Sequence, residues 1–304
     1  MIDAPKVSVV IATRSREELL HGALAAVLDQ AYSGDLEVLL VYDQAAPHAE
    51  HARSDPHRTV RVLGNERATG LAGARNTGIL AADGALVAFC DDDDVWRPGK
   101  LERQVEALRR DDAIACVTGI TVHYDGSTRD RVPGVDRLTV DELSRSRVTG
   151  AHPSSYLMDR HRGIDVVGLV DEDLPGAYGE DYDWLLRLAA VGTVTVVREP
   201  LVDVLWHRGS YFASRWDSIV EALEYLSRKH PSIAADRRGR ARVLGQQAFA
   251  HAALGRRRLA ARTGWAALRS NPTERRVYAA ALVASGLVSA ETIVHAANSR
   301  GRGI

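Results

Sequence analysis

The segment FCDDDDVWRPGK, residues 89–100, holds four consecutive carboxylates directly after an apolar run. Carboxylates held this close repel one another, and one of them tends to take up a proton unless a cation compensates their charge. A divalent ion bound to a diphosphate needs only one or two protein carboxylates, because phosphate oxygens and water complete its coordination shell. The cluster therefore predicts a site where a divalent cation and a phosphorylated ligand bind together.

Spacing separates the other interpretations of this acidic cluster. A calcium loop is excluded, because Val95 and Trp96 stand where such a loop requires an oxygen ligand and a glycine. Asp91, Asp93 and Val95 fit the Asp-x-Asp-x-Thr/Val pattern of haloacid dehalogenase-like phosphatases, with Asp91 as nucleophile. That pattern normally opens its domain, whereas a long α/β stretch precedes it here. A solvated turn that caps the helix after Pro98 is the remaining alternative.

A second acidic group occurs in GEDYDWLLRLA, residues 179–189. The Trp and Leu residues of this segment share one helical face, which leaves Glu180 and Asp181 in the first turn, projecting into a crevice. The helix dipole also favours acids at this end, so a purely structural role is the alternative.

The elements that position the first acidic group form an alternating pattern. Short β-branched runs predict strands at 6–13, 36–43, 59–64 and 85–92, with helical patterns between the first two and before the last. Such alternation predicts a largely parallel, buried sheet, whose ligands bind beyond the carboxyl ends of the strands. Asp43 and the four-Asp cluster both fall at such ends, so we expect them to share one crevice.

Further along, the pattern predicts an amphipathic helix after Pro98 and strands at 113–124 and 193–200. From about residue 215 the chain becomes helical, with Gly or Pro at each stop, as in stacked hairpins of tetratricopeptide type. Residues 231–276 contain eleven Arg against one Asp and one Glu. This basic stretch is either a solvated surface or a docking face for an anionic acceptor, a carrier or a membrane surface.

Composition excludes several classes of protein. The chain has 304 residues, 45% of them hydrophobic, and its net charge of −1 gives no bulk attraction to nucleic acid. Cys90 and Cys116 lie in apolar stretches and are expected to be reduced core residues. No apolar run is long enough to span a membrane, and the start lacks the pattern of a signal peptide. These features predict a cytoplasmic protein, with peripheral contact at the membrane surface left open.

Four segments, in this order, resemble the inverting nucleotide-sugar glycosyltransferases of family 2: SVVIATRSR, LEVLLVYD, GARNTGILAADGALVAFCDDDDVWRPGKLERQ and YGEDYDWLLRLA. The resemblance covers about residues 5–210 and leaves the helical tail outside. It implies an α/β fold of the GT-A type, a Rossmann-like mixed sheet, over residues 1–212. A small α-helical C-terminal domain would then occupy residues 213–304.

The resemblance also implies a nucleotide pocket. Thr13, Arg14 and Arg16 would line it together with Asp43, which would accept a hydrogen bond from the ring N–H of the base. That role suits the uracil or thymine of a UDP- or dTDP-sugar. Arg75 corresponds to a basic position near the phosphates.

Asp91 and Asp93 match the family's Asp-x-Asp element. Asp93 would coordinate Mn²⁺ or Mg²⁺ with Asp91, while Asp92 and Asp94 would hold ribose or sugar hydroxyls or orient the ligand. His207 would reach the metal or the diphosphate.

On the acceptor side, Asp181 would be the catalytic base, with Glu180 and Asp183 as supporting or acceptor contacts. His152 and Ser154 would also contact the acceptor. The implied reaction is a single displacement: a metal stabilises the leaving nucleoside diphosphate while the base removes the proton of the attacking hydroxyl, which inverts the anomeric configuration. The acceptor could be a glycan, a lipid carrier, a peptide or a natural product. A non-catalytic nucleotide-sugar-binding scaffold is the further alternative.

Overall fold

The computed structural model describes residues 4–14, 16–206 and 215–299. Its strands are β1 (Val7–Thr13), β2 (Leu36–Tyr42), β3 (Arg53–Asp55), β4 (Arg58–Gly64), β5 (Leu86–Phe89), β6 (Val95–Trp96), β7 (Ala115–Tyr124), β8 (Ser127–Arg131), β9 (Arg137–Leu138), β10 (Leu157–Asp159) and β11 (Val194–Leu205). They form one sheet in the order β3-β4-β2-β1-β5-β10-β7-β11-β6, with β8 beside β7 and β9 beside β11. The first half of the sheet is parallel except for β3, and β10 enters antiparallel between β5 and β7. The sheet is therefore mixed, as expected.

The helices are α1 (Glu17–Leu28), α2 (Leu71–Ala81), α3 (Lys100–Arg110), α4 (Val140–Arg145), α5 (Asp165–Val167), α6 (Glu180–Val191), α7 (Trp216–Lys229), α8 (Pro231–Ala235), α9 (Arg237–Ala253), α10 (Arg257–Ser270), α11 (Arg275–Ser285) and α12 (Ala290–Asn298). Short helical turns, η1 to η4, lie at Ala49–His51, Pro153–Ser155, Arg160–Ile164 and Pro175–Ala177. In the region predicted to be helical from about residue 215, the helical patterns at 216–230, 241–255, 257–272 and 273–286 correspond to α7, α9, α10 and α11. The sequence did not predict α8 and α12.

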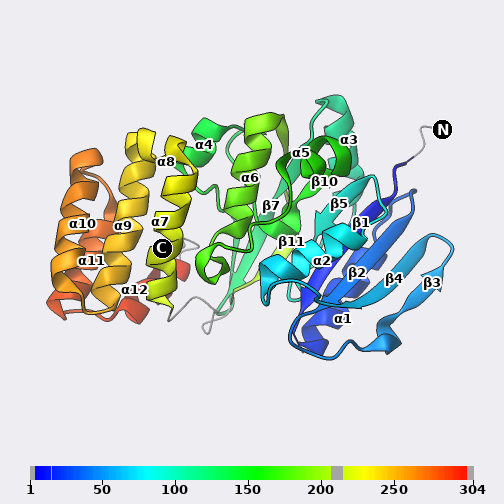
Figure 1. Cartoon of the computed structure of the whole chain (residues 1–304), viewed down its shortest axis with the longest axis horizontal. Coiled ribbons are helices and arrows are strands. Elements are labelled where there is room, and N and C mark those ends of the chain that lie inside the picture. Colours follow the sequence, from blue (N-terminus) through cyan, green and yellow to red (C-terminus); the bar gives the residue numbers. More distant parts are fainter. Residues whose placement is uncertain (1–3, 15, 207–214, 300–304) are drawn as a thin grey trace.

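Apolar residues cover both faces of the sheet, which explains why its strands are nearly continuous β-branched runs. Along β1, Val9 and Ile11 belong to the apolar cluster that includes residues of α1 and α3, whereas Val10 belongs to the other cluster, which includes Trp184 of α6. Figure 1 shows the sheet between these layers, with α9, α10 and α11 at the opposite end of the molecule from β3 and β4. This double cover leaves the strand ends as the place where polar side chains gather.

The described part of the helical tail is joined to the sheet region through α4 and α6, with α7, α8 and α9 packed against them. The division predicted at residues 212 and 213 falls within 207–214, outside the described residues, and stays a prediction. Cys90 and Cys116 are buried and free, which confirms the expectation for both thiols. None of the described helices has the length and apolar character needed to cross a bilayer.

Candidate active site

The ends of β1, β2 and β5 meet at one edge of the sheet, as their parallel register requires. The backbone N–H of Asp43 donates to the carbonyl of Thr13 at 2.9 Å, which joins the ends of β1 and β2. The Thr13 hydroxyl donates to Asp92 Oδ2 at 2.6 Å and links β1 to the turn after β5. The side chains predicted to gather at this edge of the sheet therefore do so.

Arg16 closes one side of the acidic turn. Its Nη1 donates to Asp93 Oδ2 at 2.6 Å, its Nε donates to Asp92 Oδ2 at 3.2 Å, and its Nη2 donates to Asp92 Oδ1. Burial nevertheless raises the pKa of Asp92, and burial with the adjacent Asp91 charge raises the pKa of Asp93. These two carboxylates are therefore only partly compensated by the guanidinium.

Arg75 joins the two acidic groups. Its Nη2 donates to Asp91 Oδ1 and its Nη1 to Glu180 Oε1, each at 2.8 Å, and only 3% of its side chain is exposed. Burial opposes the ionisation of Asp91, but the Arg75 charge outweighs it and lowers the pKa of that carboxyl. Burial and the neighbouring Asp181 raise the pKa of Glu180. One buried guanidinium thus connects the turn after β5 to the start of α6.

Asp94 faces a third side of the turn. The Ser154 hydroxyl donates to Asp94 Oδ2 at 2.5 Å and accepts from the Asp91 N–H at 2.9 Å, and His152 Nδ1 lies 3.3 Å from Asp94 Oδ2. Burial and the Asp91 charge raise the pKa of Asp94 well above its usual range. Ser154 is fully buried, so the prediction that it contacts an acceptor is wrong.

The residues present fit a divalent metal. Ligand atoms of Asp91, Asp94 and His152 all lie within 4.8 Å of one another. Asp93, the ligand expected from the sequence, is not in this group and pairs with Arg16, so its role at a metal stays a prediction. The carboxylate oxygens of this group suit Mn²⁺ or Mg²⁺. The raised pKa values of Asp93 and Asp94 indicate the repulsion that an additional cation would relieve. His207 lies outside the described residues.

Asp181 begins the second group, in the first turn of α6 as predicted. Gly179 before it has φ of 90°, a left-handed conformation that suits glycine and sets the angle at which the helix starts. Arg147 donates from Nη2 to Asp181 Oδ1 at 2.8 Å, and its guanidinium lies 5.4 Å from the centre of the Tyr178 ring. Sequence reasoning missed Arg147, since a single Arg in an irregular segment gives no periodic signal.

Asp43 is the centre of a separate set of polar contacts. It accepts hydrogen bonds from Asn65 at 2.8 Å, from Gln44 at 2.9 Å and from the backbone N–H of Gly70. Burial opposes its ionisation, but these donors and the nearby charge of Arg14 lower the pKa of Asp43. The carboxylate is ionised at neutral pH and can accept a further hydrogen bond.

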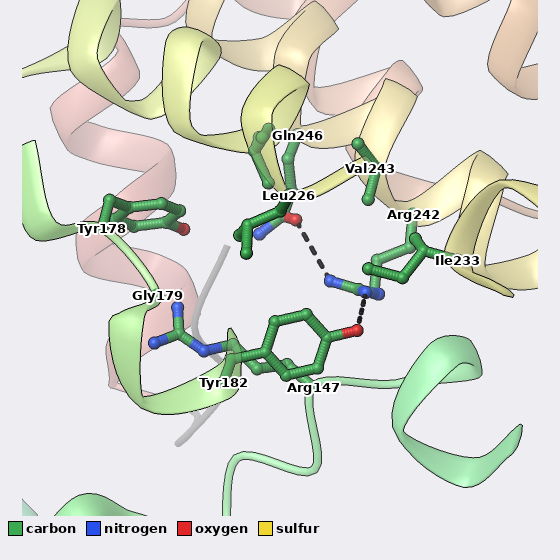
Figure 2. Close-up of a pocket in the computed structure, with 10 residues that line it drawn as sticks. Arg147, Tyr178, Gly179, Tyr182, Leu226, Ile233, Arg242, Val243 and Gln246 are labelled. Carbon is green, nitrogen blue, oxygen red and sulfur yellow. Dashed lines mark hydrogen bonds between the residues drawn. The ribbon is translucent and has the colours of Figure 1, made fainter. Parts of the chain in front are cut away.

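Behind α6, a cavity of about 10 Å³ has room for about one water molecule (Figure 2). Arg242 of α9 donates to the Tyr182 hydroxyl at 3.0 Å across this cavity, and that hydroxyl donates to the carbonyl of Leu143 at 2.7 Å. Figure 2 shows Arg147 on the same wall as Tyr182. The cavity is too small for a sugar. The residues around it connect α6 to the helical tail.

Asp183 lies apart from both the cavity and the acidic turn. It is fully buried and pairs with Arg187 at 2.9 Å, Lys229 at 2.8 Å and His230 at 2.7 Å. Of the two roles predicted for Asp183, contact with an acceptor is therefore excluded and a supporting role remains, because the carboxylate fastens α6 to α7.

Comparison with known proteins gives a family. The model of Glycosyl transferase family 2 matches residues 8–160, about half of the chain. The Escherichia coli protein WfgD, a UDP-Glc:α-D-GlcNAc-diphosphoundecaprenol β-1,3-glucosyltransferase, is 31% identical over 141 residues, which is 46% of this chain and 55% of WfgD. The succinoglycan biosynthesis protein ExoO of Rhizobium meliloti is 36% identical over 217 residues, 67% of this chain and 61% of ExoO. The chain thus spans only about half to two thirds of these relatives.

Solved structures show the same fold. Staphylococcus aureus TarS 1–349 in complex with UDP-GlcNAc superposes with a TM-score of 0.62 at 13% identity, over 98% of this chain and 92% of TarS 1–349. The mannosyltransferase PcManGT of Pyrobaculum calidifontis in complex with GDP-Man and Mn²⁺ gives 0.58 at 18% identity, over 97% and 88%. The family match favours a transferase over a phosphatase for the Asp-rich turn. The chain belongs to glycosyltransferase family 2 and has a GT-A fold with a helical C-terminal region.

Proposed function

We propose that the chain is an inverting glycosyltransferase that moves a hexosyl group from a UDP- or dTDP-sugar to an acceptor hydroxyl with the help of Mn²⁺ or Mg²⁺. The observation that carries the proposal is the Arg75 bridge, which holds Asp91 at the turn after β5 and Glu180 at the start of α6 on the same guanidinium. One acidic group is thereby fixed for the leaving diphosphate and the other for the acceptor.

On the donor side, Asp91 and Asp93 would hold the metal, with His152 or His207 as a further ligand, and the metal would stabilise charge on the departing diphosphate. Thr13, Arg14 and Arg16 would line the nucleotide pocket, and Asp43 would accept from the ring N–H of the base. TarS was solved with UDP-GlcNAc, WfgD is named for UDP-Glc, and PcManGT was solved with GDP-Man and Mn²⁺. Two of the three support a uracil base.

On the acceptor side, Asp181 would be the base that takes the proton of the attacking hydroxyl. Arg147 holds Oδ1 of that carboxylate, which fixes its orientation and leaves Oδ2 for the hydroxyl. Glu180, tied to Arg75, would position the start of α6. WfgD and a second Escherichia coli relative, WfaP, are both named for α-D-GlcNAc-diphosphoundecaprenol. Among the predicted acceptor classes, these names favour a sugar carried on a lipid diphosphate.

The test is Asp181→Asn, which keeps the shape of the side chain and removes its basicity. We expect transfer to fall by about 10²-fold or more, the scale of general-base catalysis, while the affinity for UDP with Mn²⁺ stays at the wild-type level. Asp165→Asn is the matched control, because Asp165 is an exposed acid of α5 paired with His161. Turnover in Asp181→Asn equal to that of the control would refute the assignment of the base.

The donor is found by a thermal-shift panel of UDP, dTDP and GDP and their sugars, each with and without Mn²⁺. A ligand that binds only the folded chain raises its Tm, so the true nucleotide should give the largest shift and need the metal. Strong nucleotide binding without transfer from any donor would favour the scaffold interpretation.

A further inference from the structure

The outer side of α10 carries an unusual set of side chains. Arg258, Arg262, Trp265 and Arg269 follow one another at spacings of four, three and four residues, so they lie on one helical face. All four are exposed, and Trp265 is 66% exposed. The opposite side of α10, with the small residues Ala260, Gly264 and Ala267, is buried. The polar and aromatic stripe therefore points away from the rest of the molecule.

The next helix extends this surface. On α11, Arg275 is exposed and Tyr278 and Leu282 are 56% and 43% exposed, and Leu287 in the following turn is 76% exposed. Figure 1 shows α10 and α11 side by side at the end of the molecule farthest from β3 and β4, and both helices pack on α9. We call this surface the basic–aromatic face; it consists of Arg258, Arg262, Trp265, Arg269, Arg275, Tyr278, Leu282 and Leu287.

The charge of the face is positive and largely uncompensated. No Asp or Glu occurs between residues 237 and 273. Two neighbouring guanidiniums do have acidic partners, since Arg256 pairs with Asp217 and Arg276 with Glu274. In contrast, the four arginines of the basic–aromatic face form no salt bridge with any residue that the structure describes. Their charge is therefore available to an anionic partner.

We propose that the basic–aromatic face docks the protein on an anionic lipid surface. Arg residues near a membrane are attracted by anionic headgroups, and Trp, Tyr and Leu side chains enter the boundary between headgroups and acyl chains. A soluble polyanion would engage the guanidiniums but leave Trp265 and Leu287 in water. A lipid surface satisfies both kinds of side chain at once. The binding itself is independent of the reaction, although its purpose, to reach a lipid-linked acceptor, rests on the proposed function.

The experiment uses the full chain and vesicles of phosphatidylglycerol and phosphatidylcholine, with pure phosphatidylcholine as the neutral comparison. We expect binding to the anionic vesicles that weakens as salt is added. The triple variant Arg258→Gln, Arg262→Gln, Arg269→Gln should bind about 10²-fold more weakly, from about 1 kcal/mol per arginine near the surface. The control changes Arg110, Arg162 and Arg198 to Gln, which removes the same charge from exposed positions in the sheet region.

Trp265 reports where the face lies in the bilayer. Brominated lipids should quench its fluorescence in anionic vesicles, and Trp265→Phe should lose that part of the quenching, since Trp96 and Trp184 are buried and Trp206 and Trp216 are half-buried. Equal vesicle binding by the triple variant and its control would overturn the proposal. The proposal would also be overturned if the wild-type protein did not bind vesicles but used the same arginines to form a dimer or to bind a soluble polyanion.

These results are distinguishable from a failure of the proposed function. Asp181→Asn should bind vesicles like the wild type, because Asp181 lies at the start of α6 and not on the basic–aromatic face. The triple variant should in turn transfer sugar normally to a short-chain, water-soluble acceptor. A triple variant that loses transfer to such an acceptor would overturn the docking role and place these arginines in the catalytic machinery.

Discussion

The Arg16 guanidinium pairs with the acidic turn where a metal ion would bind, so we expect the removal of this side chain to strengthen metal binding. Arg16→Gln should increase the affinity of the nucleotide-free protein for Mn²⁺. The guanidinium contacts Asp92 and Asp93, and 46% of its side chain is exposed, so it can be displaced. Removing it takes away a positive charge that repels the incoming ion and frees carboxylate oxygens to bind that ion.

The size of the effect follows from exposure. Unit charges at about 4 Å interact with about 1 kcal/mol in water, which doubles to about 2 kcal/mol for a divalent ion, and salt screens part of it. The incoming ion replaces the charge that Arg16 supplies to Asp92 and Asp93, so little is lost when these two pairs break. We therefore expect the Kd for Mn²⁺ to fall roughly tenfold. The buried Asp92, without Arg16, should also lower the Tm of the metal-free variant.

Titration calorimetry and the electron paramagnetic resonance of free Mn²⁺, at pH 8 to keep the carboxyls ionised, measure this affinity without nucleotide. Arg53→Gln is the matched control, because Arg53 is 52% exposed, pairs with Asp55 on β3 and carries the same charge. If Mn²⁺ binds Arg16→Gln no more tightly than the control, Arg16 does not compete with the metal and the turn is not the metal site.

Three further predictions concern single side chains. Asp43→Asn should weaken UDP binding by about 10-fold to 100-fold in calorimetry, the cost of one charged hydrogen bond. An unchanged Kd would show that the uracil does not bind at Asp43. Burial opposes the ionisation of Asp183, but its three partners Arg187, Lys229 and His230 outweigh it and lower the pKa of Asp183 to about 2, so its stabilising effect is present above about pH 4 and lost as pH falls toward 2. Urea denaturation of Asp183→Asn should show a loss of about 2 kcal/mol at pH 7 that shrinks at pH 3. Burial lowers the pKa of Lys100 to about 7, so the unfolded chain binds a proton between about pH 10 and 7 and the folded chain does not. The free energy of unfolding should therefore decrease as the pH is lowered from about 10 to 7. Lys100→Met should increase that free energy by up to about 4 kcal/mol at pH 7 and by almost nothing at pH 10.

The position of the crevice could be predicted from the sequence because it depends on a simple rule. Strands buried on both faces are read from apolar runs, and parallel strands bring their carboxyl ends to one edge. Thr13, Asp43 and the four-Asp turn follow from that rule. The region between β7 and α6 could not be predicted in this way, since its strands and helices are short and irregular.

The partners of the acidic residues could not be predicted, because pairing across the sheet depends on distant segments. Arg16 and Asp92 are 76 positions apart, and Arg75 and Glu180 are 105 apart. Asp183 is a different case, because helical geometry alone could have corrected it. Residues two positions apart on a helix with 3.6 residues per turn point to opposite sides, so Asp181 and Asp183 could not both face the crevice.

The charge balance of the crevice favours one route for a metal. The four Asp of the turn, with Glu180 and Asp181, face three guanidiniums, those of Arg16, Arg75 and Arg147. Arg75 is 3% exposed and holds two acids at once, so displacing it would leave buried charges unpaired at a cost of about 3–5 kcal/mol. Arg16 is 46% exposed, and an ion bound at the turn would itself compensate Asp92 and Asp93, so Arg16 costs less to move. A divalent ion should therefore enter on the Asp93 side by displacing Arg16, and the buried Arg75 bridge should stay in place whether or not the ion is bound.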